Sequence, residues 1–514
     1  MPELNENAAV YFVDRHAQTD YSDKPAFIDG VTGKTVTYGE LARESGKVAD
    51  LFERHGINQE DRVAMLMLDQ IDFPVVFWGS LKAGVVPIAL NTLLSTDIYE
   101  YILNDSRVRA LCVSQELLPV VEPLFGKIRT LDKIFVVGDG SMPEGCISLR
   151  DELGKAAFRE PVICSQDECA FWLYSSGSTG QPKGVRHVHR SLRATADTYG
   201  RLVLGIEHDD TVFSVAKLFF AYGLGNASTF PLSVGATTIL LSGRPTPDAV
   251  FAILNKYEPS IFFAVPTFYA AMNAAMESGE YSIGHKLRRC VSAGEALPRE
   301  VGIRWEKRTG CEILDGVGST EMLHIFLSNT PGDVEYGTSG TAVPGYDIRL
   351  VNESGNEVAV GEVGELLVKG ESSAVEYWNL RDKSRGTFEG WWTRTGDKYE
   401  RTENGRLVYC GRTDDMFKVS GIWVSPFEVE QALVDHPAVL EAAVVAARDK
   451  EDLEKPKAFV VLQQGAERNG LEAALKEHVK ESVGKWKYPR WIEFVDELPK
   501  TATGKIQRFK LRDG

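Results

Sequence analysis

The sequence predicts an α/β protein with a largely parallel sheet, followed by a small β-rich region and a C-terminal α+β domain. Short apolar strands alternate with amphipathic helices in the first part of the chain. After about residue 335 the pattern changes to short strands and turns, and from about Ser425 helices and strands alternate again. With 514 residues the chain is too long for one compact core, so two or more domains are expected.

The first expected helix begins at a capping box. Thr37 and Glu40 have the N-cap and N3 spacing, and apolar residues recur at helical spacing from there to about Gly56. A buried strand over residues 62–68, a helix over 73–82 and a strand over 85–89 follow. This alternation is typical of a parallel sheet covered by helices.

Several later strands lead directly into polar or glycine-rich loops. They are expected at residues 168–174, 237–241, 261–265, 289–292 and 312–315. Loops at the carboxyl ends of parallel strands line the ligand crevice. We therefore expect the four loops after 174, 265, 292 and 315 to converge on one site.

The remaining elements follow from alternation and turn residues. Asn404-Gly405 predicts a hairpin turn in the β-rich region. Strands are expected at 346–351, 364–368, 406–409, 442–447 and 457–462, helices at 426–434 and 471–483, and a polar, turn-rich tail at 498–508.

The segment 174–184 has the composition of a phosphate-binding loop. Its hydroxyl side chains, glycines and terminal lysine offer N–H and O–H donors and a positive charge to a polyphosphate. It is not a Walker loop, because Pro182 stands five residues after Gly177 where that pattern requires glycine. A flexible surface loop is the alternative interpretation. The candidate phosphate-binding residues are Ser175, Ser176, Gly177, Ser178, Thr179, Gly180 and Lys183.

Composition excludes some classes of function. A net charge of −16 and a pI near 5.2 argue against nucleic acid or an anionic membrane as a partner. The sequence shows neither a secretory signal nor an apolar run of membrane-spanning length, which predicts a cytoplasmic protein. The seven cysteines are scattered and never spaced Cys-x-x-Cys, which disfavours a disulfide framework and a zinc knuckle. His187 and His189 would share one face of a strand, but no third metal ligand is suggested nearby.

Five segments occur in an order and spacing that resemble the adenylate-forming acyl-CoA synthetase superfamily, which includes luciferases and peptide-synthetase adenylation domains. They are residues 174–184, 316–321, 393–397, 411–415 and 499–508, and the resemblance covers essentially the whole chain. Segments 216–226 and 318–329 are similar to the substrate-lining segments of bacterial benzoate–CoA ligases.

The resemblance implies a two-step reaction. In the first step the carboxylate of the acid, which the resemblance implies to be benzoate, attacks the α-phosphorus of ATP in the presence of Mg²⁺ and releases pyrophosphate. In the second step the thiol of coenzyme A displaces AMP from the acyl-adenylate. It also implies a fold with two mostly parallel sheets in an N-terminal domain, residues 1–413, of which 335–413 form a β-rich subdomain. A mobile C-terminal domain, 414–514, would rotate about a hinge at Asp414.

The resemblance also implies roles for individual residues. Lys505 is expected to supply positive charge at the reacting α-phosphate, and Glu321 beside Thr320 to hold Mg²⁺. Asp397 is expected to accept the ribose hydroxyls, with Arg412 beside the nucleotide. The remaining nucleotide-binding candidates are Gly294, Glu295, Ala296, Asp315, Gly316 and Ser319.

The acyl pocket implied by the resemblance is apolar and includes aromatic rings, which suits a flat arene. After the domain rotation, segment 418–423 would face the active site and receive coenzyme A. The pocket candidates are Phe220, Ala221, Tyr222, Gly223, Ala227, Val317, Gly318, Leu323, His324 and Ile325. The candidates on the coenzyme A side are Lys418, Ser420, Gly421 and Trp423.

Other functions stay open at this stage. A substituted benzoate or another small cyclic acid is the nearest alternative substrate. A luciferase-like oxygenase, an enzyme that loads a carrier protein in trans, and a non-catalytic nucleotide-binding regulator are less favoured. Lys505 also resembles a lysine that protein acetyltransferases modify in relatives. The chain is expected to be a monomer or a homodimer.

Overall fold

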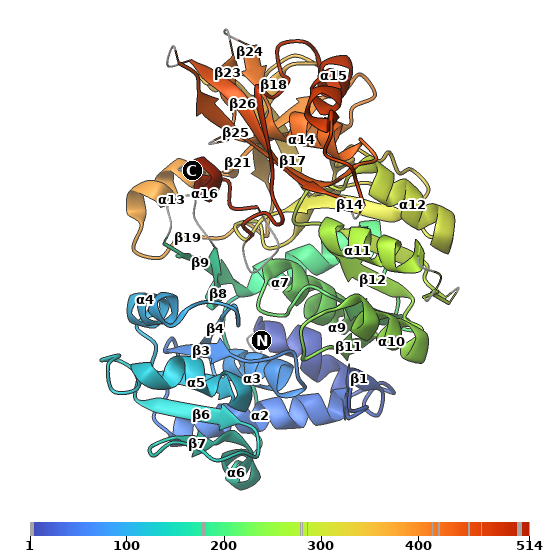
Figure 1. Ribbon diagram of the computed structural model, residues 1–514. Helices are drawn as coiled ribbons and strands as arrows, with labels where there is room; N and C mark the ends of the chain where they lie inside the picture. The colour runs from blue at the N-terminus through green and yellow to red at the C-terminus, as the bar shows by residue number, and fades with distance from the viewer. Residues whose placement is uncertain are drawn as a thin grey trace.

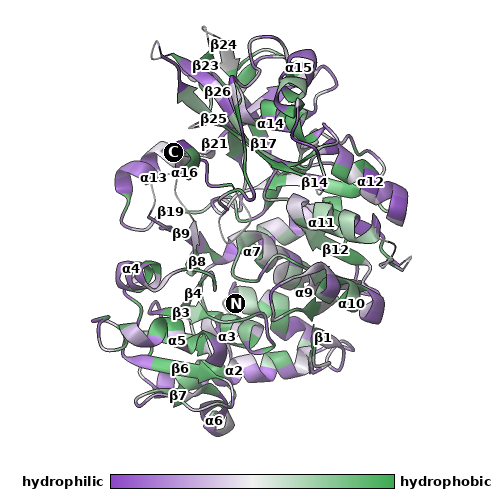
Figure 2. Cartoon of the chain, viewed as in Figure 1, coloured by the Kyte–Doolittle hydropathy of each residue, from purple (hydrophilic) through white to green (hydrophobic). Residues whose placement is uncertain are grey.

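The computed structural model describes residues 5–175, 181–277, 279, 281–284, 286–413, 415–419, 422–450, 453–463, 465–500 and 506–512. Two large sheets with their helices form the lower part of the molecule in Figure 1, and the C-terminal sheet and helices lie above them. Figure 2 shows hydrophobic residues concentrated on the strands of the large sheets. Among the described helices, none combines the length and the apolar composition needed to span a membrane.

The first large sheet contains eight strands in the order β19-β9-β8-β4-β3-β5-β6-β7. The strands from β8 to β7 in this order are parallel, and β9 and β19 are added antiparallel at one edge. Its strands are β3 (Arg62–Leu66), β4 (Val86–Ala89), β5 (Ala110–Ser114), β6 (Lys133–Val137), β7 (Ile147–Ser148), β8 (Cys169–Ser175), β9 (Lys183–Val188) and β19 (Glu376–Tyr377).

The second large sheet contains nine strands in the order β16-β15-β14-β13-β12-β10-β11-β1-β2. Its central strands are parallel, so the fold has the two mostly parallel sheets that were predicted. Its strands are β1 (Pro25–Asp29), β2 (Thr35–Thr37), β10 (Thr211–Ser214), β11 (Thr237–Leu240), β12 (Ile261–Ala264), β13 (Arg289–Ser292), β14 (Ile313–Gly318), β15 (Ile325–Ser328) and β16 (Thr341–Ala342).

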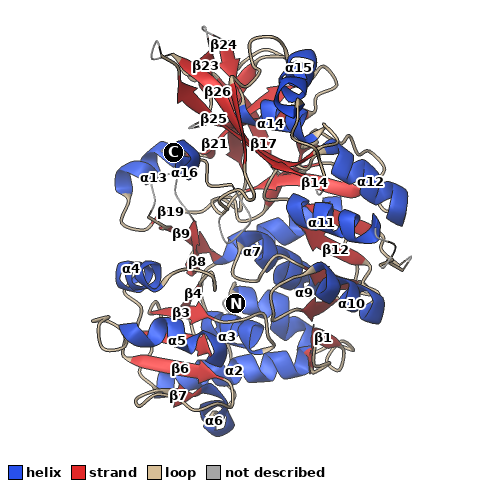
Figure 3. Cartoon of the chain, in the orientation of Figure 1, coloured by secondary structure: helices blue, strands red, loops and turns tan. Residues whose placement is uncertain are grey.

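Helices cover the faces of these sheets, as Figure 3 shows. The capping box is confirmed: Thr37 Oγ1 accepts the Glu40 N–H at 3.2 Å, and Glu40 Oε2 accepts the Thr37 N–H at 2.9 Å. The α-helices are α1 (Arg15–Ala17), α2 (Tyr38–Arg54), α3 (Asp72–Lys82), α4 (Thr96–Ser106), α5 (Leu118–Val121), α6 (Leu149–Lys155), α7 (His189–Thr195), α8 (Ala221–Leu224), α9 (Phe230–Val234), α10 (Pro247–Tyr257), α11 (Pro266–Glu277), α12 (Arg299–Thr309) and α13 (Arg381–Thr387).

A five-stranded sheet follows the two large sheets. The Asn404-Gly405 turn joins two of its strands as predicted, with the Thr402 N–H donating to the Arg406 carbonyl at 2.9 Å. The sheet contains β17 (Asp347–Val351), β18 (Val363–Lys369), β20 (Phe388–Glu389), β21 (Trp392–Arg401) and β22 (Leu407–Arg412).

The C-terminal part has a hydrophobic core of its own, which includes Val429, Leu433, Leu475 and Val479. Asp414 lies outside the described residues, so the domain boundary at 413/414 and the hinge stay predictions. The elements of this part are β23 (Phe417–Val419), β24 (Ile422–Val424), α14 (Pro426–Val434), β25 (Val439–Arg448), β26 (Glu454–Leu462), α15 (Leu471–Val483), β27 (Trp491–Phe494) and α16 (Phe509–Arg512).

Two local expectations were wrong. Residues 316–318 were expected in a loop, but they extend β14, because β15 folds back and pairs with them in antiparallel register. His189 was expected on the same strand as His187, but it begins helix α7, and its Nδ1 accepts the Ala8 N–H at 3.1 Å. Both differences arise from contacts with segments that short-range periodicity does not reveal.

Candidate active site

The carboxylate of Glu321 lies where the two large sheets meet. Its Oε1 accepts a hydrogen bond from Tyr377 Oη at 2.8 Å, and Ser175 Oγ is 3.5 Å away. Lys183 Nζ is 3.9 Å from the same oxygen. The structure therefore brings together three residues that the sequence proposed for phosphate and metal binding, namely Ser175, Lys183 and Glu321. Tyr377, on β19, was not foreseen, because nothing in its sequence neighbourhood marks it.

Lys183 is a partly desolvated cation at this point. Its ammonium lies 4.3 Å from the centre of the Tyr377 ring. Burial lowers the pKa of Lys183, whereas the charge of Glu321 acts to raise it. Among the described residues Glu321 is the carboxylate that pairs with Lys183, and an ammonium group so placed can bind a further anion at this edge of the site.

His187 positions Thr320 through the backbone. Its Nε2 donates to the Thr320 carbonyl at 2.8 Å, and its ring is fully buried. Burial lowers the pKa of His187 to about 4, so the ring is neutral at pH 7. The described residues contain no group of three or more His, Cys, Asp or Glu side chains arranged to hold a metal ion. His187 is thus a buried support for the turn 319–324.

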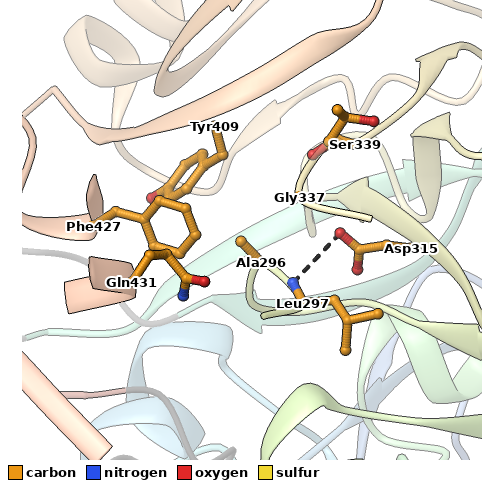
Figure 4. A pocket seen from close by; sticks show the side chains of 9 residues that line it. Ala296, Leu297, Asp315, Gly337, Ser339, Tyr409, Phe427 and Gln431 are labelled. Atoms are coloured by element: carbon orange, nitrogen blue, oxygen red, sulfur yellow. Dashed lines mark hydrogen bonds between the residues drawn. The ribbon is translucent and has the colours of Figure 1, made fainter. Parts of the chain in front are cut away.

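A cavity lies between the turn after β13 and the C-terminal part, and Figure 4 shows it from close by. Asp315 borders it with only 5% of its surface exposed. One carboxylate oxygen accepts the Leu297 N–H at 3.4 Å, while the other, Oδ1, has no hydrogen-bond partner among the described residues. Burial raises the pKa of Asp315 well above its usual value. The lining residues are Ala296, Leu297, Asp315, Gly337, Thr338, Ser339, Tyr409, Phe427 and Gln431.

This cavity includes two of the expected nucleotide-binding residues, Ala296 and Asp315. Gly294 and Glu295 lie in the same turn, directly before Ala296. Tyr409 and Phe427, whose ring centroids are 5.1 Å apart, line the cavity from the C-terminal side. The sequence did not indicate either ring, because their contact joins β22 to α14.

Asp397 and Arg412 face each other on the paired strands β21 and β22. Arg412 Nη1 donates to Asp397 Oδ1 at 3.0 Å and to the Thr395 carbonyl at 3.0 Å. The carboxylate of Asp397 contributes to raising the pKa of Arg412. Ser319 has a local role as well, since its Oγ accepts the Met322 N–H at 3.1 Å. Asp397, expected at the ribose, and Arg412, expected beside the nucleotide, are therefore adjacent.

His324 lies in a buried cluster of aromatic rings. Its ring centroid is 4.5 Å from that of Phe230 and 5.5 Å from that of Tyr222. Its Nε2 donates to Asn226 Oδ1 at 3.0 Å, and burial lowers its pKa to about 3. A Cβ atom at Gly225 would lie 2.3 Å from His324 Cδ2, so only glycine permits this approach. The ring is therefore neutral and buried among aromatic side chains.

The other pocket candidates fall into two groups. Phe220, Ala221, Tyr222 and Val317 are partly exposed, and Gly318 is exposed. Ala227, Leu323 and Ile325 are at most 3% exposed and belong to the hydrophobic core. Gly223 is buried, and a Cβ atom there would lie 1.9 Å from the Lys217 carbonyl oxygen. The first group retains access for a ligand, whereas the second group packs behind it.

Several predicted residues lie outside the description. These are Lys505, Asp414 and the segment 176–180, together with Ser420, Gly421 and the side chains of Lys418 and Trp423. After segment 501–505, Arg508 forms a bidentate ion pair with buried Glu430. Its Nε donates to Oε1 at 3.0 Å, and its Nη2 donates to Oε2 at 2.7 Å. Ile506 pairs with Lys500 in antiparallel register, so these two described residues, which flank segment 501–505 in the sequence, lie side by side.

Comparison with known proteins identifies the family of the chain. The model of the AMP-binding enzyme family matches residues 13–378, and that of the AMP-binding enzyme C-terminal domain matches residues 428–505. The chain belongs to the AMP-binding enzyme family. This result confirms the superfamily resemblance that the sequence motifs indicated.

Two relatives within this family match nearly end to end. The chain is 51% identical to a 4-hydroxybenzoate–CoA/benzoate–CoA ligase of Rhodopseudomonas palustris, over 100% of this chain and 95% of the relative. It is 53% identical to a benzoate–CoA ligase of Thauera aromatica, over 98% of this chain and 95% of the relative.

Solved structures of the family superpose closely. A benzoate CoA ligase from Burkholderia xenovorans LB400 matches with a TM-score of 0.90 and 49% identity, covering 99% of this chain and 100% of that chain. The anthranilate CoA ligase AuaEII, in complex with anthranoyl-AMP, matches with a TM-score of 0.95 and 40% identity, covering 100% and 98%.

The neutral, buried histidines predict a pH-dependent stability. The folded-state pKa values of His187 and His324, about 4 and about 3, lie below the unfolded value of 6.5. The unfolded chain therefore binds more protons below about pH 6.5, and each histidine removes up to about 1.4 kcal/mol of stability per pH unit as the pH falls toward its folded pKa. We expect the thermal midpoint to fall between about pH 7.5 and 5.5.

Variants separate this effect from general acid sensitivity. His324→Gln should show a smaller fall in thermal midpoint over this range than the wild type, whatever its midpoint at neutral pH. His208→Gln, at an exposed position, is the matched control and should retain the wild-type fall. Equal falls in both variants would contradict the assignment of a neutral His324.

Proposed function

We propose that this protein ligates benzoate, or a closely related aryl carboxylate, to coenzyme A through an acyl-adenylate. The first half-reaction consumes ATP, requires Mg²⁺ and releases pyrophosphate. The second half-reaction releases AMP. The observation that carries the proposal is the 51% and 53% identity, over essentially the whole chain, to two relatives that are named as benzoate–CoA ligases. We further infer a cytoplasmic enzyme, in keeping with its seven free cysteines.

The phosphates of ATP would lie at the Ser175–Lys183–Glu321 cluster. Lys183 supplies positive charge, and the loop that starts at Ser175 supplies donors to the β- and γ-phosphates. Glu321 and Thr320 would hold Mg²⁺, which prefers oxygen ligands, keeps several waters and needs few protein carboxylates. The hydrogen bond from Tyr377 fixes one oxygen of Glu321, so its carboxylate has a defined orientation. When bound, Mg²⁺ would neutralise charge on the ATP phosphates.

The nucleoside would occupy the cavity of Figure 4 and the adjacent strand pair. Asp315 Oδ1, which has no hydrogen-bond partner in the part of the chain that the structure describes, can accept a hydrogen bond from the adenine amino group. The turn of Gly294, Glu295 and Ala296 would contact the base, and Asp397 would accept the ribose hydroxyls. Arg412, already bound to Asp397, would orient that carboxylate.

The aryl ring would lie between Phe220–Tyr222 and Val317–Gly318. These residues offer apolar and aromatic contacts and no acidic side chain to pair with a substrate amine. Neutral His324 lies behind Tyr222 and adds no charge to the wall. A substituted benzoate is the second candidate substrate, because the similar proteins include a 4-hydroxybenzoate–CoA/benzoate–CoA ligase and an anthranilate CoA ligase.

The C-terminal domain would serve the two half-reactions in turn. Lys505 would stabilise the negative charge that develops at the α-phosphate during adenylation. Rotation about Asp414 would then replace it by the segment 418–423, where Gly421 leaves room for the pantetheine arm. Acetylation of Lys505 would remove its charge and would stop the first half-reaction.

Substrate choice can be tested with the purified protein. We expect ATP-, Mg²⁺- and coenzyme A-dependent release of AMP and pyrophosphate with benzoate, at least about tenfold higher in kcat/KM than with cyclohexane carboxylate. The panel should include 2-, 3- and 4-hydroxybenzoate and 2-aminobenzoate. If the protein turned over none of these aryl acids, the proposal would be contradicted. A hydroxy- or aminobenzoate with a higher kcat/KM than benzoate would support the second candidate, a substituted benzoate.

The two half-reactions test Lys505. Lys505→Ala should lose adenylation by about 100-fold or more, because the charge at the α-phosphate is removed. It should still convert supplied benzoyl-AMP and coenzyme A to the thioester within about threefold of the wild-type rate. Lys500→Ala, in the same tail and paired with Glu441, is the matched control and should retain both half-reactions. Equal loss of both half-reactions in Lys505→Ala would contradict the assigned role.

A further inference from the structure

The proposed mechanism does not use the buried carboxylate of Asp69. It lies in the loop between β3 and α3 and is only 4% exposed. Its two oxygens accept the backbone N–H of Leu218, at 3.2 and 3.3 Å. Asp69 follows a strand of the eight-stranded sheet, whereas Leu218 follows β10 of the nine-stranded sheet. The hydrogen bond therefore joins the two halves of the large domain beside the proposed acid pocket.

Leu218 belongs to the turn 217–220, which leads directly into α8. The Phe220 N–H donates to the Lys217 carbonyl at 3.0 Å, and the Leu224 N–H donates to the Phe220 carbonyl at 2.8 Å. The Lys217 carbonyl oxygen also packs closely against α8 at Gly223, where a Cβ atom would lie only 1.9 Å from it. A shift of Leu218 must therefore shift the residues of the pocket wall, Phe220 and Tyr222.

The charge of Asp69 is balanced by that of Lys217, which acts on it without a direct ion pair. Lys217 supplies the positive charge that acts on Asp69, and its Nζ donates to the carbonyls of Leu241 and Gly243. Removing two such charges from water has a high desolvation cost, and apolar residues of similar volume often give equal stability. Burial raises the pKa of Asp69 to about 6. Stability alone therefore gives no reason for a carboxylate at this position.

We propose that Asp69 is a positioning residue for the aryl acid: its ionised carboxylate holds the 217–220 turn against α8 and so fixes Phe220 and Tyr222 for contact with the ring. The inference rests on the proposed function for the identity of the ligand. The anchoring of the turn rests on the structure alone. Protonation of Asp69 removes the charge that attracts the Leu218 N–H and so loosens the turn.

Steady-state kinetics test the effect on the acid. Asp69→Asn keeps the shape but not the charge, and it should raise KM for benzoate about tenfold while KM for ATP stays within twofold. In the wild type, KM for benzoate should rise as the pH falls below about 6, and this rise should be absent in Asp69→Asn. Asp72→Asn, three residues away and lining a different cavity, is the matched control and should behave as the wild type.

Hydrogen exchange tests the anchor without any substrate. Peptides covering 215–224 should exchange faster in Asp69→Asn than in the wild type, while those covering 393–401 should be unchanged. Equal exchange in the two proteins would overturn the anchor. Three kinetic results in Asp69→Asn would overturn the link to the aryl acid. They are an unchanged KM for benzoate, equal increases in KM for benzoate and for ATP, and a KM for benzoate that still increases below about pH 6. If the wild type turned over no aryl acid, the proposed function would fail, and the exchange result would still decide the anchor.

Discussion

The site depends on the hydrogen bonds that fasten the turn 319–324 of one large sheet to the edge of the other. His187 donates to the Thr320 carbonyl, Tyr377 donates to the Glu321 carboxylate, and the Ala374 N–H donates to the Glu321 carbonyl at 2.7 Å. These three partners come from the edge strands β9 and β19 or from the segment just before β19. Because each group is at least partly buried, loss of one bond would leave a polar atom unsatisfied. The edge contact thus fixes the proposed phosphate and metal residues together.

Burial sets the chemical character of the two pockets in opposite ways. Around His324 it keeps an imidazole neutral, so that the proposed ring pocket is uncharged and aromatic. At Asp315 it leaves a carboxylate oxygen beside the proposed adenine cavity that no described residue hydrogen-bonds, and a ligand donor can satisfy it there. Both pockets meet at β14, since Asp315 and Val317 lie on the same short strand. A nucleotide and an aryl acid bound to these pockets would therefore be neighbours.

Much of the fold could be predicted from sequence, because periodicity and capping are local. The helix α2 with its capping box, the strands β8 and β13, and the helices α14 and α15 are examples. The ordered motifs located Ser175, Lys183 and Glu321, which the structure brings together. Tyr377, Phe427 and Asp69 were missed, because their contacts join segments far apart in the chain. The extension of β14 was missed for the same reason, as its partner β15 folds back onto it.

The acyl-adenylate is the central claim, and oxygen transfer tests it most directly. The protein would be incubated with ATP, Mg²⁺, coenzyme A and benzoate labelled with oxygen-18 in both carboxylate positions, and AMP would be analysed by mass spectrometry. Attack of the carboxylate on the α-phosphorus predicts one labelled oxygen in each AMP released. Unlabelled AMP, or label in inorganic phosphate formed together with ADP, would contradict the account.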